Sequence, residues 1–130
     1  MSILSAIPVL NCQSIDATLN FYQQALQFVI VKKREEEGEL QWVHLMNGST
    51  TLMLQRVNLQ SPRSEVKSKP SVLLYFYVNN IKEISHLIKA KYNIDADISV
   101  TPYKMSECDI FDPEGNHITL GQKNTDTADD

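Results

Sequence analysis

The chain has 130 residues, of which 42% are hydrophobic and 22% are charged, and its formal net charge is -4. These values are ordinary for a globular chain that folds as one compact domain or as two small modules. The acidic balance disfavours nucleic acid as the main partner, and no apolar run approaches the ~18 residues that span a bilayer. We therefore expect no nucleic-acid partner and no membrane partner.

The two cysteines, Cys12 and Cys108, lie far apart in the sequence. The amino terminus lacks the basic and then apolar pattern that is typical of a signal peptide. In a reducing compartment such cysteines stay free and pack as small core residues. The expected location is therefore the cytoplasm.

The first half of the chain predicts a strand, a helix and then three strands. A strand at 7–12 carries a proline near its start, where a missing backbone donor is tolerated. Ser14 is a suitable N-cap, and apolar residues then recur at helical spacing. Three β-prone segments follow, at 28–33, 41–46 and 50–56. The dipeptide Asn47-Gly48 between the last two is a strong hairpin signal.

The second half repeats this order after a segment rich in proline, serine and charged residues, 58–71, which predicts a linker. A strand is expected at 72–78, and Asn80 with Glu83 resembles the capping box that begins a helix. The remaining predicted strands are 96–100, 105–111 and 117–122. A tight turn, Asp112-Pro113-Glu114-Gly115, joins the last two strands. The polar residues 123–130 predict a disordered tail.

This repeat organises the chain into a first βαβββ module at 1–57, the linker, and a second βαβββ module at 72–122. The predicted fold class is α+β. Two such modules can each bury surface that the other would leave exposed. We expect them to form a curved mixed sheet around a ligand cavity.

Residues 10–28, with Phe21-Tyr22, Leu26 and Phe28, resemble the opening of the vicinal oxygen chelate superfamily, which includes glyoxalases, bleomycin resistance proteins and dioxygenases. The 112–116 turn resembles the closing turn of that family. In the segments that resemble the superfamily, Gln27 and Lys104 occupy positions where its members usually have glycine. A residue other than glycine at position 27 either adopts the left-handed conformation at some cost or ends the helix differently.

The resemblance also implies where a metal would be held, because metal-using members project histidines or carboxylates from the first and last strands of each module. In this chain those positions are occupied by Ile7, Met53, Leu73 and Thr119. The two modules agree, because Leu73 follows Ile7 by 66 positions (73 - 7) and Thr119 follows Met53 by the same number (119 - 53). Isoleucine and leucine carry no donor atom, a thioether is soft, and a neutral hydroxyl alone binds such metals weakly. We therefore expect no metal, no cofactor and no catalytic residue at these positions.

Strand alternation places Leu73, Tyr75 and Tyr77 on one face, which suggests an apolar pocket with a few hydrogen-bonding groups. Trp42 and His44 share a face whose direction the sequence leaves open. The predicted ligand-binding residues are Trp42, Met53, Tyr75, Tyr77, Tyr103, Met105, Glu107 and Thr119. The predicted function is metal-independent binding or sequestration of a small aromatic or amphipathic organic molecule, similar to bleomycin-resistance-like proteins. The resemblance also implies a homodimer.

Two alternatives remain open at this point. The chain is a lyase, isomerase or dioxygenase of the same superfamily if the fold gathers a relocated metal site, for instance His44, Glu107 and His117. It is an interaction subunit if bulky side chains fill the cavity. A nucleophilic Cys108 is disfavoured, because the neighbouring carboxylates of Glu107 and Asp109 would raise the pKa of its thiol.

Overall fold

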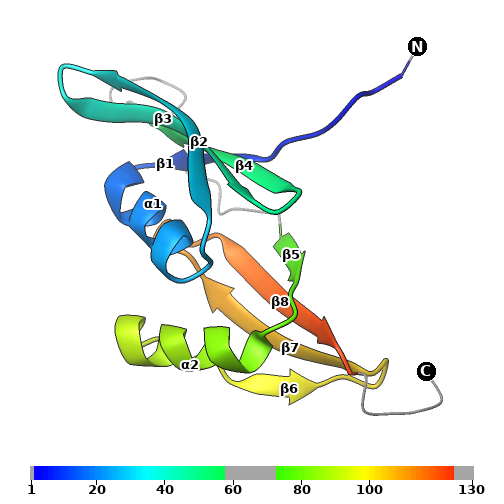
Figure 1. The fold of residues 1–130 in the computed structure, drawn as a ribbon. Helices are drawn as coiled ribbons and strands as arrows, with labels where there is room; N and C mark the ends of the chain where they lie inside the picture. The colour runs from blue at the N-terminus through cyan, green and yellow to red at the C-terminus, as the bar shows by residue number, and fades with distance from the viewer. Residues whose placement is uncertain (1, 58–72, 125–130) are drawn as a thin grey trace. The chain divides into compact units, whose positions relative to one another are not determined.

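The computed structural model describes residues 2–57 and 73–124, and the chain divides into two compact units, residues 1–68 and 69–130. The first unit contains β1 Val9–Cys12, α1 Ile15–Gln24, β2 Val29–Glu36, β3 Glu39–Asn47 and β4 Thr50–Arg56. The second contains β5 Leu73–Tyr77, α2 Ile81–Tyr92, β6 Ile98–Val100, β7 Met105–Phe111 and β8 His117–Lys123 (Figure 1). The predicted α+β class and the tandem βαβββ order are confirmed. The predicted linker and all but the first two residues of the predicted tail lie outside the described residues.

In the first unit the sheet has the strand order β1-β4-β3-β2, with β1 parallel to β4 and the other neighbours antiparallel. Residues of β1, β3 and β4 are buried on the face that packs against α1, whereas every residue of β2 is exposed. This core contains Leu10, Cys12, Val43, Leu45, Leu52 and Leu54 from the sheet and Ile15, Thr18, Phe21 and Tyr22 from the helix. The other face therefore carries the residues between them, among them Met53.

The second unit repeats this arrangement with the order β5-β8-β7-β6, and β5 is parallel to β8. Its helix α2 packs on one face of the sheet, over Leu74, Cys108, Ile110, Ile118 and Leu120, which are all buried. Val9 pairs with Met53 in the first unit, and Tyr75 pairs with Thr119 in the second. These two pairs are related by the same offset of 66 positions (75 - 9 and 119 - 53), so the repeat extends to the strand register.

The expected capping box of α2 is not formed. Asn80 occupies the N-cap position, but its side chain makes no capping hydrogen bond. Instead, the Ile81 N–H donates to Oε1 of Gln122 at 2.8 Å, so a residue of β8 satisfies the start of the helix. A tertiary contact thus replaces the local one, because the amide side chain of a neighbouring strand reaches the same unpaired N–H groups.

Several strand boundaries also differ from the prediction: the strands expected at 7–12, 28–33 and 41–46 are Val9–Cys12, Val29–Glu36 and Glu39–Asn47. The strand expected at 96–100 begins only at Ile98, because the Ala96 carbonyl accepts a hydrogen bond from the Ser85 hydroxyl at 2.5 Å instead of joining a strand ladder. The last strand continues to Lys123, one residue into the predicted tail. Neither described helix is long and apolar enough to cross a membrane.

The turn after α1 holds Gln27 in the left-handed conformation, with φ of 59°. The neighbouring backbone is anchored, since the Phe28 N–H donates to the Tyr22 carbonyl at 2.9 Å and Asn47 Nδ2 donates to the Leu26 carbonyl at 2.9 Å. Of the two outcomes considered for this position, the structure shows the left-handed one. The tertiary contacts therefore impose a conformation that glycine adopts more readily.

We expect Gln27→Gly to stabilise the protein by about 0.5–1 kcal/mol. The substitution relieves about 1–2 kcal/mol of strain from the left-handed conformation in the folded state. Part of this gain is offset, because glycine gives the unfolded chain a greater backbone entropy. Urea unfolding measures the difference. The matched control is Gln27→Val, which should destabilise because a β-branched residue tolerates positive φ poorly. Equal stabilities of the two variants would contradict this explanation.

Candidate functional site

The turn between β7 and β8 sets the geometry of the site. Asp112 is buried, its Oδ1 accepts hydrogen bonds from the N–H groups of Glu114 and Asn116, and its Oδ2 accepts one from Asn116 Nδ2, all at 2.9 Å. Gly115 completes the turn at φ of 86°. The resulting register places Glu107 opposite Gly121, Asp109 opposite Thr119 and Phe111 opposite His117.

These pairs lie on the sheet face that points away from α2, because the intervening residues form the core beneath the helix. Leu73, Tyr75 and Tyr77 of β5 share this face by the parallel register with β8. Several of its large side chains are exposed, with 82% of Tyr77, 54% of Phe111 and 50% of Leu73 accessible. We call it the open face of the second sheet.

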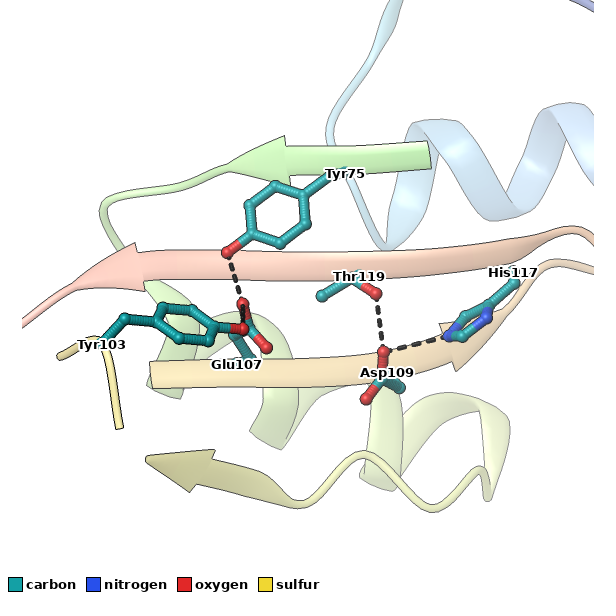
Figure 2. Close-up of polar contacts among 6 residues, drawn as sticks. All are labelled: Tyr75, Tyr103, Glu107, Asp109, His117 and Thr119. Carbon is teal, nitrogen blue, oxygen red and sulfur yellow. Dashed lines mark hydrogen bonds and ion pairs between the residues drawn. The ribbon is translucent and has the colours of Figure 1, made fainter. Parts of the chain in front are cut away.

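Two tyrosine hydroxyls converge on one carboxylate of the open face. Tyr75 from β5 donates to Oε2 of Glu107 at 2.7 Å, and Tyr103 from the segment before β7 donates to the same oxygen at 3.0 Å (Figure 2). Tyr77 lies beside Tyr75, with the ring centroids 5.1 Å apart. Tyr75, Tyr77, Tyr103 and Glu107 form the tyrosine–glutamate cluster.

Tyr75 reaches Glu107 by crossing β8 at Gly121. A Cβ atom at position 121 would lie 2.5 Å from Cζ and 2.7 Å from Cε1 of the Tyr75 ring, both closer than real Cβ contacts. Because β8 lies between β5 and β7, only a strand residue without a side chain lets the ring pass. Gly121 is therefore a structural requirement of the cluster.

The carboxylate keeps both donors protonated. Burial of its hydroxyl and then the hydrogen bond to Glu107 raise the pKa of Tyr75 far above the ordinary value near 10. The hydrogen bond to Glu107, followed by burial, also raises the pKa of Tyr103. A raised pKa stabilises the folded state below the ordinary pKa, and this contribution disappears as the pH rises through the folded-state value. At neutral pH both tyrosines are therefore neutral donors.

A second polar group lies further along the same face. Asp109 Oδ1 accepts a hydrogen bond from the Thr119 hydroxyl at 2.6 Å and lies 3.0 Å from His117 Nε2 (Figure 2). Phe111 stacks on the His117 ring, with centroids 4.9 Å apart. The Thr119 hydrogen bond, together with His117, lowers the pKa of Asp109. This carboxylate therefore stabilises the fold above its ordinary pKa and loses that effect as the pH falls through its lowered pKa.

The first unit presents Trp42 and His44 on the face that points away from α1, which answers the question left open by the sequence. His44 lies opposite Met53 in the register, and Trp42 lies opposite Gln55. The two rings are 6.3 Å apart. Nε2 of His44 is buried, and residues 2–57 and 73–124 supply no hydrogen-bond partner for it.

The predicted ligand-binding residues thus fall into two groups. Six of them lie on or beside the open face of the second sheet: Tyr75, Tyr77, Tyr103, Met105, Glu107 and Thr119. Trp42 and Met53 belong to the first unit. Sequence reasoning missed Asp109 and Gly121 as parts of the site. Because residues two apart in a strand point to the same face, the prediction for Glu107 could have been extended to Asp109. No local sequence pattern indicates that Gly121 belongs to the site.

The residues present do not fit a divalent metal at the positions that metal-using members employ. Of the four, only Met53 and Thr119 carry a side-chain donor atom, and the Thr119 hydroxyl already donates to Asp109. In the described parts of the chain no group of three or more His, Cys, Asp or Glu residues could hold a metal ion. Glu107 and His117, two members of the relocated site considered above, lie four residues apart in the β7 register, on the order of 13 Å.

Cys108 is not a suitable nucleophile. It is fully buried on the face beneath α2, and its Sγ lies 3.4 Å from the Ala96 carbonyl. Burial, and then the charge of Asp109, raise the pKa of its thiol to about 11. The thiolate is therefore scarce at neutral pH, which agrees with the expectation from the sequence.

Comparison with known proteins places these features in a family. Residues 5–120 match the model of the Glyoxalase/Bleomycin resistance protein/Dioxygenase superfamily. One similar solved structure is a bleomycin resistance determinant encoded on transposon Tn5, which is 19% identical, covers 93% of this chain and 98% of its own, and has a TM-score of 0.66. Another is a lactoylglutathione lyase from Agrobacterium tumefaciens, which is 18% identical, covers 93% of this chain and 95% of its own, and has a TM-score of 0.68. The fosfomycin resistance protein FosX from Listeria monocytogenes is also similar, with 9% identity, coverage of 96% of this chain and 97% of its own, and a TM-score of 0.72. A search of curated protein sequences found no significant match.

Proposed function

Because the chain belongs to the glyoxalase/bleomycin resistance protein/dioxygenase superfamily, we propose that it uses this fold to bind or sequester a small aromatic or amphipathic organic molecule without a metal ion. The observation that carries the proposal is the tyrosine–glutamate cluster on the open face of the second sheet. There, an 82% exposed Tyr77 ring lies beside a Tyr75 hydroxyl that is already oriented by Glu107. Exposed aromatic rings next to fixed polar groups are typical of sites for organic ligands.

The chemistry of the donor set supports the proposal that binding does not depend on a metal. Thr119 stands at a position where metal-using members carry an ionisable ligand, and it is bonded to Asp109 instead. Met53, its counterpart in the first unit, offers only a soft thioether. A bleomycin resistance determinant is among the structural neighbours, which supports binding as the activity. The homodimer that the resemblance implies is part of the proposal, and sedimentation of the ligand-free and ligand-bound protein measures it.

The test is a titration with naphthylmethanol, a neutral amphipathic probe, in the presence of EDTA, and amide NMR spectra monitor the binding. We expect the largest chemical-shift changes at residues of the tyrosine–glutamate cluster. Tyr77→Leu should weaken binding about threefold to tenfold, because it removes an aromatic contact. Val100→Ala is the matched control, since Val100 is 69% exposed but lies on the opposite side of the same sheet. Shifts elsewhere, or loss of binding in EDTA, would contradict the proposal.

The enzyme alternative remains a distinct outcome, because a lactoylglutathione lyase and FosX are also structural neighbours. A metal-dependent enzyme requires a metal site, and the described residues contain no group of three or more His, Cys, Asp or Glu residues that could hold a metal ion. Metal analysis of protein purified without chelator distinguishes the two functions. A stoichiometric divalent ion would favour the enzyme.

A further inference from the structure

The tyrosine–glutamate cluster carries a negative charge that its own hydrogen bonds do not neutralise. Both donors to Glu107 are neutral hydroxyls, and both bind the same oxygen, Oε2. Among residues 2–57 and 73–124, the hydrogen bonds to Glu107 are these two, and the ion pairs do not include this carboxylate. Hydrogen bonds orient and stabilise an anion, but only a cation compensates its charge.

The surrounding charges do not change this balance. Asp109 lies two residues along β7 on the same face, and its carboxylate has the same sign. Lys123 shares the face but lies opposite Met105, and it forms no ion pair with Glu107 in the described structure. The chain as a whole is acidic, with a net charge of -4. An anionic ligand would therefore be repelled from the cluster.

The aromatic side chains point to the same preference. Tyrosine rings attract cations through the negative potential of their faces, and this attraction adds to that of a nearby carboxylate. Tyr75 and Tyr103, from two different segments of the second unit, contact Glu107, and the Tyr77 ring lies beside Tyr75. A carboxylate among tyrosines is suited to an organic ammonium group more than to a neutral alcohol or an acid.

We propose that the tyrosine–glutamate cluster recognises a positively charged group of the ligand, either a protonated amine or a quaternary ammonium. This inference rests on the proposed function and narrows it to organic cations. Oε1 of Glu107, which accepts no hydrogen bond from the described residues, receives the positive group, while the exposed Tyr77 ring contacts the apolar part. Tyr75 and Tyr103 act as positioning residues, because their hydroxyls hold the carboxylate in place.

Three probes that share one ring system test the charge: naphthylmethylamine, naphthylmethanol and naphthoate. We expect the amine to bind about tenfold more tightly than the alcohol, and the carboxylate to bind most weakly. Glu107→Gln keeps an oxygen that can accept the two tyrosine hydrogen bonds but removes the charge. In this variant the amine should lose about tenfold in affinity, while the alcohol should change less than about twofold. Added salt should weaken only the amine.

The matched control is Glu83→Gln, which removes a carboxylate from the first turn of α2, on the other side of the sheet. It should leave the preference for the amine unchanged. Equal affinities of the amine and the alcohol for the wild-type protein, or a preference that survives Glu107→Gln, would overturn the inference while leaving the proposed function intact. If none of the three probes changes the amide chemical shifts of the cluster residues, both proposals are wrong.

Discussion

Replacing Asp112 by alanine is expected to destabilise the protein by about 3–5 kcal/mol. The side chain is buried and accepts three hydrogen bonds within the 112–116 turn, so its removal leaves two backbone N–H groups and one amide without their acceptor. Unsatisfied buried donors of this kind are costly, and acceptors that carry a charge contribute more than neutral ones. Urea unfolding of the variant and the wild type measures the loss.

Asp112→Asn is the matched control for this prediction. It keeps Oδ1 for the N–H groups of Glu114 and Asn116 but turns an amide toward Asn116 Nδ2. We expect a smaller loss, about 1–2 kcal/mol, because one hydrogen bond is replaced by two facing donors. If the alanine variant were no less stable than the asparagine variant, the turn would not depend on these bonds.

Gly121→Ala is expected to destabilise the protein by about 1–3 kcal/mol and to remove Tyr75 from the cluster. The new methyl group would overlap the Tyr75 ring, whose Cζ is 2.5 Å from the ideal Cβ position. Overpacking of this size forces a side chain out of its rotamer. Once the ring leaves, the hydrogen bond to Glu107 is lost, and the pKa of Tyr75 should fall toward its ordinary value. Urea unfolding and a spectroscopic titration of the tyrosines measure the two effects.

A double-mutant cycle isolates this contact. In a Tyr75→Ala background there is no ring to displace, so the same Gly121→Ala change should cost less than about 0.5 kcal/mol. The backbone at position 121 has ordinary φ and does not itself require glycine. An equal cost in both backgrounds would show that the glycine serves the strand and not the tyrosine.

The two units share a topology but have different chemistry on equivalent faces. The pair Val9 and Met53 in the first sheet becomes Tyr75 and Thr119 in the second. Replacement of valine by tyrosine supplies the hydroxyl that reaches Glu107, and replacement of methionine by threonine supplies the donor to Asp109. The polar site of this chain is therefore built mainly from the second repeat.

Much of the fold could be predicted from local signals. In β1, β4 and β7 period-two alternation determined which residues enter the core, since a one-residue shift would expose every one of them. The two positions where the family usually has glycine, Gln27 and Lys104, both adopt positive φ, at 59° and 66°. That agreement arises because the turn geometry, and not the side chain, selects the conformation.

Tertiary structure decided how the site is assembled. The sequence by itself placed Tyr75, Tyr77 and Thr119 on sheet strands and excluded strong metal ligands at the family's positions. Only the pairing of β5, β8 and β7 brought the Tyr75 hydroxyl across Gly121 to Glu107, and joined Asp109 to Thr119 and His117. Contacts between strands that are distant in sequence depend on register and side-chain direction, and composition or local periodicity does not specify which hydroxyl meets which carboxylate.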